Sequence, residues 1–150
     1  MITAALKTIL ADSGCTLVIY EQDKLANLWT DQANQLDTVG VIMQLNELRL
    51  EVKANAILEH YDKLTIDIMR QVRLEDKADN NEVDLQQLLD ICKEIIVRLI
   101  ATGEFKTIVP VQVFKILETK YDANTIGWTM ILNLTYLKNE IREPCLIVTP

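Results

Sequence analysis

The chain has 150 residues, of which 49 % are apolar, and it carries 15 basic against 22 acidic side chains for a net charge of −7. This length and composition predict one domain with its own core and exclude a disordered chain. Apolar runs are too short to span a membrane, and the basic stripe of a nucleic-acid-binding protein is absent from the sequence. The N-terminus does not resemble a signal peptide, so we expect a protein made and kept in a cytoplasm.

The N-terminal third is expected to hold a helix and a short strand. The spacing of apolar residues predicts an amphipathic helix over Thr3–Ser13, ended by Gly14 in the left-handed region. The β-rich run Thr16–Glu21 predicts a strand. Asp23–Gln35 shows no clear period, which indicates a loop with at most one helical turn.

The central segment predicts a long β-hairpin. Alternation begins at Val39, slips in phase at Asn46, and then places apolar residues at every second position to Leu58. A second alternating run covers Leu64–Leu74. We interpret Glu47–Leu58 and Leu64–Leu74 as the two legs of one hairpin, on either side of the sequence EHYDK. A leg of about twelve residues reaches about 40 Å, so the hairpin must project or pack on another chain. The alternative is a helix over the first leg, because Glu, Leu, Arg, Lys and Ala favour helices.

A long helix is predicted next, after a solvated acidic loop. We expect Asn81 to cap it, and we expect the helix to run from Asp84 to Thr102 and to end at Gly103. Its apolar surface exceeds one face, so the helix should cover a sheet and also touch something else. The expected buried stripe is Leu85, Leu88, Leu89, Cys92, Ile95, Ile96 and Leu99.

Two strands are predicted to complete the sheet. Lys106–Lys120 contains Pro110, which belongs at a strand start, an edge or a bulge, because proline lacks an N–H group. In Tyr121–Asn139, a tight turn leads into a strand with a period of two. Turn formation is expected at Asp122 and Asn124, and Gly127 should admit a close neighbour at the strand entry. On the face beneath the helix we expect Ile126, Trp128, Met130, Leu132, Leu134 and Tyr136.

These elements predict an α+β fold: a single domain with a mostly antiparallel sheet, a projecting central hairpin, one long helix and a short N-terminal helix. The domain is expected to span residues 1–139. Residues 140–150 form a C-terminal extension with an apolar centre, which docks either on its own core or on a neighbour.

Reactive chemistry has little support in the sequence. The four glycines are isolated, so there is no phosphate loop, dinucleotide fingerprint or nucleophile elbow. The three cysteines are widely separated and are interpreted as buried thiols. His60 is expected to be exposed and idle, and the carboxylates of Glu75–Asp84 do not match a calcium-binding loop. We therefore expect no enzyme, metal or cofactor.

The order of elements resembles that of the tail-completion or tail-terminator proteins of tailed bacteriophages. The closest correspondence lies in the turn and strand entry, Asp122, Ala123, Asn124, Thr125, Ile126, Gly127 and Trp128, followed by the strand Thr129–Tyr136. The long hairpin legs and the extension after Asn139 depart from this pattern. They leave open whether the chain is a tail terminator or a neck-ring protein of a short-tailed phage.

The resemblance implies a structural virion protein, assembled in the host bacterial cytoplasm, that forms a hexameric or dodecameric ring through which DNA passes without specific binding. Neighbouring portal, adaptor or tail proteins would be its partners, with no membrane. The alternative is a soluble cellular adaptor that binds a basic protein or peptide at an open sheet edge. For a ring, the expected subunit contacts are Leu50, Val52, Ile66, Ile68, Ile131, Leu137 and Leu146.

Overall fold

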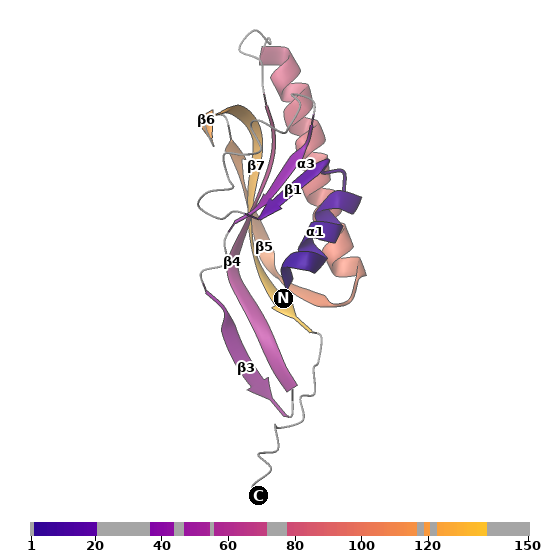
Figure 1. Ribbon diagram of the computed structural model, residues 1–150, viewed down its shortest axis with the longest axis vertical. Helices are drawn as coiled ribbons and strands as arrows, with labels where there is room; N and C mark the ends of the chain where they lie inside the picture. The colour runs from indigo at the N-terminus through magenta and orange to yellow at the C-terminus, as the bar shows by residue number, and fades with distance from the viewer. Residues whose placement is uncertain are drawn as a thin grey trace, which may run out of the picture.

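Two helices cover one face of a curled, mostly antiparallel sheet, so the predicted α+β class is confirmed (Figure 1). The computed structural model describes residues 2–20, 37–43, 47–54, 56–71, 78–116, 119–120 and 123–137. In chain order the elements are α1 (Ile2–Asp12), β1 (Leu17–Tyr20), β2 (Val39–Ile42), β3 (Arg49–Lys53), β4 (Ala56–Gln71), α3 (Ala78–Ala101), β5 (Phe105–Ile116), β6 (Thr119–Lys120) and β7 (Ala123–Tyr136).

The long strands β4 and β7 form the centre of the sheet, whose order is β1-β2-β4-β7-β5. Only the β1–β2 pair is parallel among the strand pairs of the described residues. Strands β2 and β3 both pair with the edge of β4 opposite β7: β2 along Ile66–Met69 and β3 along Ala56–His60. One edge of β4 is therefore shared by two strands in series.

Helix α1 ends at the predicted glycine. The N–H of Gly14 donates to the carbonyl of Ala11 and the N–H of Cys15 donates to that of Leu10, at 3.3 and 3.1 Å. Gly14 has a φ of 119°, a conformation that costs glycine little. These two bonds satisfy carbonyls that the end of a helix leaves unpaired. Thr16 follows at once, and its N–H already bonds Thr38 beside the β1–β2 pair.

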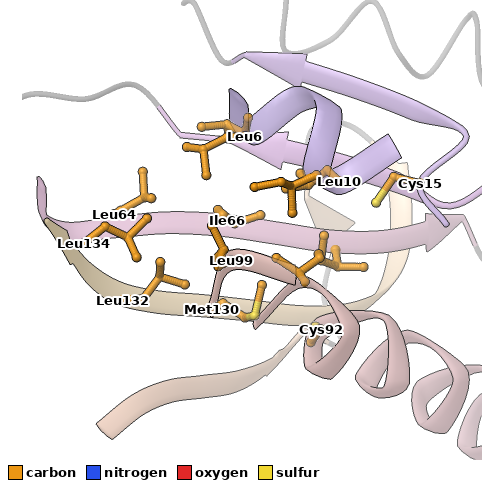
Figure 2. Close-up of a cluster of buried hydrophobic side chains, with 14 of the residues drawn as sticks. Leu6, Leu10, Cys15, Leu64, Ile66, Cys92, Leu99, Met130, Leu132 and Leu134 are labelled. Carbon is orange, nitrogen blue, oxygen red and sulfur yellow. The ribbon is translucent and has the colours of Figure 1, made fainter. Parts of the chain in front are cut away.

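The main core lies between the helices and the face of the sheet formed by alternate residues of β4 and β7 (Figure 2). This confirms the predicted parity of the last strand and the predicted stripe of the long helix except at Leu89, which is half-buried and lies outside the core cluster. Trp128 lies at the border of this core, where its indole N–H donates to the carbonyl of Leu85 at 2.8 Å. Core residues from the four elements include Leu6, Leu10, Leu64, Ile66, Leu88, Cys92, Ile95, Leu99, Met130, Leu132 and Leu134.

Helix α3 begins at Ala78, upstream of the predicted start, so Asn81 lies inside the helix and not at its cap position. The segment between Ala78 and Asp84 contains neither glycine nor proline, so nothing in it prevents the helix from beginning at Ala78. The predicted end is confirmed, because Gly103 has a φ of 66° directly after the last turn.

The central hairpin turns at a different place from the predicted one. Lys53 pairs with Ala56, so the turn lies between these two residues, and EHYDK lies within β4. Residues facing each other across a two-residue turn share a face, so the apolar parity changes from even positions in β3 to odd positions in β4. A continuous alternation in the sequence therefore hid the turn. The helical alternative for this segment is excluded by both strands.

A bulge in β4 restores the even parity. The register with β7 shifts between Tyr61 and Leu64, and Lys63 within it has a φ of 55°. The backbone N–H of Lys63 donates to the Asn133 side-chain carbonyl at 2.8 Å, which satisfies a group that the bulge removes from the ladder. Tyr61 and Leu64 consequently face the same core.

Strand β5 lies at the sheet edge, and its register with β7 shifts between Ile108 and Gln112, the interval that holds Pro110. The predicted placement of Pro110 at an edge or bulge is confirmed. Further along β5, Val113 packs on the helix side, whereas Ile116 is buried and Phe114 exposed on the other side. The switch in apolar parity in this strand thus reflects two apolar faces.

Gly127 leaves room for a close approach between β7 and the backbone of β4. It stands between Met69 of β4 and Ile116 of β5, and a Cβ at this position would overlap the backbone carbonyl of Ile68. The predicted close approach is confirmed. Met69 and Ile116 belong to a second cluster, with Val39 and Val41, on the face away from the helices. Without a side chain at Gly127 between them, these residues reach each other.

We expect Gly127→Ala to destabilise the domain by about 3 kcal/mol, because the added carbon meets backbone rather than a movable side chain. Gly103→Ala is the matched control. Its positive φ costs about 1–2 kcal/mol, but the added carbon there enters open space. Urea unfolding of both variants measures the difference. Equal losses of stability would contradict the steric role of Gly127.

Candidate interaction surface

A two-stranded arm extends from the end of the sheet beyond both helices (Figure 1). We define the arm as residues 48–53 together with residues 56–58 of β4. The strand β7 accompanies β4 only as far as the pair of Glu59 with Tyr136. In the described chain, β3 pairs with β4 alone. Beyond this pair, the arm is therefore a hairpin without a third strand among the described residues.

One face of the arm is apolar and open. Every residue of β3 is exposed. The side chains on this face are Leu48 (51 % exposed), Leu50 (59 %), Val52 (76 %) and Ile57 (43 %). Cross-strand pairing puts Val52 opposite Ile57, so the four side chains form one patch, named here the apolar arm face. Contiguous exposed apolar side chains mark a surface for association.

The apolar arm face continues the buried face of the sheet. In β4, Ile57 is followed at two-residue steps by Glu59 and Tyr61, and Tyr61 is buried in the main core. The Tyr61 hydroxyl donates to a Glu59 carboxylate oxygen at 2.6 Å. Burial, and then this bond to Glu59, raise the pKa of Tyr61. The same face of the sheet is thus covered along the body and bare along the arm.

The other face of the arm carries the charged side chains of β3, and two of them are bonded to β4. One ring nitrogen of His60 lies 2.7 Å from a Glu51 carboxylate oxygen, and the other lies 2.8 Å from the Thr135 hydroxyl. Arg49 pairs with Asp62 at 3.2 Å, and this hydrogen bond raises the pKa of the guanidinium. These contacts hold β3 against β4 and β4 against β7.

His60 is not the exposed, idle side chain expected from the sequence. The turn lies elsewhere, so His60 is in the interior of a strand, and its side chain is only 12 % exposed. The row of Glu51, His60 and Thr135 has the residue types of an acid–base–nucleophile set. The Thr135 side chain is buried, however, so its hydroxyl does not face a substrate. The row is interpreted as a structural link.

The predicted contact residues divide into three groups. Leu50 and Val52 are exposed on the apolar arm face, and Leu137 is exposed just after β7. Ile66 and Ile68 are fully buried in the chain's own core, so the prediction that they contact a second subunit is wrong. The bulge and the early turn place them in the body instead of an expected projecting leg.

The remaining predicted residues lie on or beyond the last strand. Ile131 is half-buried on the face away from the helices, opposite Thr65 and Gln112. Leu146 and Asp122 lie outside the described residues. Asn124 pairs with Thr119 next to the connection in which the turn is predicted. The sequence pattern places Leu48 on the apolar side but misses Ile57, whose parity follows only from the two-residue turn.

Further exposed apolar side chains occur away from the arm. Val97 and Ile100 lie on the solvent side of α3, and Phe114 lies on the edge strand β5, each more than half exposed. Val97 and Ile100 agree with the expectation that the apolar surface of the helix is wider than its buried stripe. That this surface touches something else stays a prediction. The described part of the chain therefore presents apolar surface away from the arm as well.

A carboxylate lies on the face of the sheet away from the helices. Asp67 is fully buried and accepts a hydrogen bond from the Thr129 hydroxyl at 2.6 Å. Within the described ranges, no three His, Cys, Asp or Glu side chains are grouped so as to hold a metal ion.

Burial raises the pKa of the Cys15 and Cys92 thiols to about 12. At neutral pH these thiols are therefore protonated and weakly nucleophilic.

Comparisons with known proteins give no assignment. No model of a known protein family matches the chain, and no curated protein matches it significantly in sequence. Among the described residues, no helix is long and apolar enough to cross a membrane.

We expect Val52→Asp to leave the domain folded and Ile66→Asp to unfold it. Val52 keeps its solvent contact in the monomer, so the change should lie within about 0.5 kcal/mol. At Ile66 the new carboxylate would be buried without a partner, at a cost of about 4 kcal/mol or more. Circular dichroism during thermal unfolding distinguishes the two. A large loss of stability in Val52→Asp would mean that the arm belongs to the folding core.

Proposed function

We propose that the chain is a structural subunit of a phage tail or neck, a tail-completion or head–tail joining protein that forms a ring around the path of DNA. The observation that carries this proposal is the bare apolar face of an arm attached to a domain whose main core is already closed. Such a face is stabilised when a neighbouring chain covers it.

The position of the apolar surfaces favours a ring of identical subunits. The apolar arm face lies beyond the helices at one end of the molecule, whereas Val97, Ile100 and Phe114 lie on the body. A contact between different patches on identical chains is heterologous, and it forms a ring when the rotation from one subunit to the next closes. The element order that resembles tail-completion proteins supports the same conclusion.

The charge of the chain suits a conduit for DNA. Its net charge is −7, and phosphate groups are repelled by a surface of the same sign. DNA then passes through the ring without being held. The partners in this proposal are further copies of the chain and the adjacent portal, adaptor or tail proteins of the particle.

The second candidate, an adaptor for a basic protein or peptide, has one observation in its favour. Strand β5 is the edge of the sheet in the described chain, and an edge strand accepts an added strand. The acidic net charge fits a basic ligand. Self-association separates the candidates, because an adaptor needs none.

We expect the purified full chain to assemble into closed rings, alone or with adjacent phage proteins, and Ile57→Asp to prevent ring assembly. The new charge lies within the apolar arm face and requires desolvation at a contact. Light scattering after size-exclusion chromatography and electron microscopy measure assembly.

Lys93→Asp serves as the matched control, because Lys93 is exposed on α3 away from the arm. The control should assemble normally. A chain that never assembles, alone or with portal, adaptor or tail proteins, contradicts the ring and favours the adaptor. Normal rings formed by Ile57→Asp would exclude the apolar arm face as the ring contact.

The isolated protein should not bind duplex DNA measurably at physiological salt, because like charge opposes association. A mobility-shift titration with a random-sequence duplex tests this, and lysozyme provides a basic control protein of similar size. Tight binding that weakens steeply with added salt would show that the protein grips DNA.

A further inference from the structure

The outer edge of β3 has a regular pattern of charge. From Glu47 to Lys53 the sequence reads ELRLEVK, with charged residues at the odd positions and apolar residues at the even ones. All seven residues are exposed, and no described strand pairs with this edge. A straight, open strand edge is a template for another strand, which proteins normally block with a bulge, a proline or a cover.

The turn determines which backbone groups of β3 face outward. In a hairpin with a two-residue turn, the closing pair exchanges both backbone hydrogen bonds, and bonded pairs recur at every second residue. Lys53 and Ala56 are the closing pair. By this alternation the backbone groups of Lys53, Glu51 and Arg49 point to β4. Those of Val52, Leu50 and Leu48 point to the open edge.

An added antiparallel strand must place its own outward-facing residues opposite these three. For a second copy of β3, this condition leaves only registers in which even positions face even positions. Charged residues then face charged residues on one side of the new pair, and apolar residues face apolar residues on the other. The signs of the facing charges decide among these registers.

In the register centred on Leu50, every facing charge is opposite in sign. Glu47 faces Lys53 of the second copy and Arg49 faces Glu51 of the second copy, and the two-fold symmetry repeats both pairs. Cross-strand pairs of opposite charge stabilise a sheet. On the apolar side, Leu50 faces its own counterpart and Leu48 faces Val52 of the second copy.

The neighbouring registers are unfavourable. A shift of two residues one way sets Arg49 against Lys53 and Glu51 against Glu51. The same shift the other way sets Arg49 against Arg49 and Glu47 against Glu51. Like charges directly opposite destabilise a strand pair. One further step toward the turn brings Leu50 opposite Ala54, which has a φ of 54° and has left the strand.

We infer that β3 pairs edge to edge with β3 of a second copy of this chain, antiparallel and centred on Leu50. The sheets of two copies would then be continuous through their arms, and Leu48, Leu50 and Val52 of both copies would meet on one side of the joined sheet. The contact is two-fold and therefore differs from the heterologous contact of a ring. In a ring assembly it joins two rings, and without one it makes a dimer, so it does not depend on the proposed function.

Charge reversal at the ends of the pattern tests the register. Lys53→Glu sets a glutamate against Glu47 of the second copy, and Glu47→Lys sets a lysine against Lys53 of the second copy, so each variant repels itself. An equimolar mixture of the two variants restores opposite charges at both pairs. Analytical ultracentrifugation over a concentration series, in the Ile57→Asp background to suppress rings, measures dimer formation.

We expect each single variant to weaken the dimer about tenfold, and the mixture to recover an affinity within about threefold of the parent. The parent is the Ile57→Asp chain, because Ile57 lies on β4, away from the edge of β3. A parent that remains monomeric at all concentrations overturns the inference. So does a mixture no tighter than the single variants.

Cross-linking fixes the geometry independently. Glu47→Cys and Lys53→Cys are made separately in a Cys145→Ser background, which leaves the buried Cys15 and Cys92. In the inferred register, the two new thiols of a mixed dimer lie on a pair with Cα atoms about 4.5 Å apart, suited to a disulfide. Like positions lie about 20 Å apart.

Mild oxidation should therefore give a covalent dimer from the mixture and none from either variant alone. Cross-linking by each variant alone, or none in the mixture, overturns the register. Rings that persist while this dimer is absent would leave the proposed function intact and remove only the two-fold contact.

Discussion

The structure depends on a difference in length between its central strands and the helix that covers them. A strand advances about 3.3 Å per residue and a helix about 1.5 Å. The 16 residues of β4 therefore reach about 53 Å, whereas the 24 residues of α3 reach about 36 Å. The helix covers one part of the strand, with α1 beside it. The remainder of β4, paired with β3, is the arm.

This mismatch explains why one continuous face of the sheet changes character along its length. On this face Tyr61, Leu64 and Ile66 of β4 are buried in the main core beneath the helices, whereas Ile57 is exposed. The opposite face of the arm, by contrast, is joined to the body, because His60 contacts both Glu51 and Thr135. An arm fixed on one face and bare on the other is suited to present apolar surface in a defined direction.

Most elements can be predicted from the sequence because their periods are long and regular. The last strand, the stripe of α3, the glycine at the end of α1 and the edge position of Pro110 follow from local chemistry. The hairpin turn cannot be predicted in this way, because the sequence between Lys53 and Ala56 contains neither glycine nor proline and the alternation continues through it. The bulge at Lys63 also leaves no signal in the sequence. The alternation of apolar residues therefore assigns Ile66 and Ile68 to an interface instead of the core.

The two-residue turn of the arm also bears on the order of folding. β3 and β4 are joined locally, and short loops close at little entropic cost. The central pair is closed by distant residues, such as Glu59 with Tyr136, so its formation waits for the intervening chain. The arm is therefore expected to form while β7 is still unpaired, when the nascent chain has apolar surface to protect. Alternating charges along β3 would then restrict early encounters between chains, since they attract a second strand in the register centred on Leu50 and repel it in the two neighbouring registers.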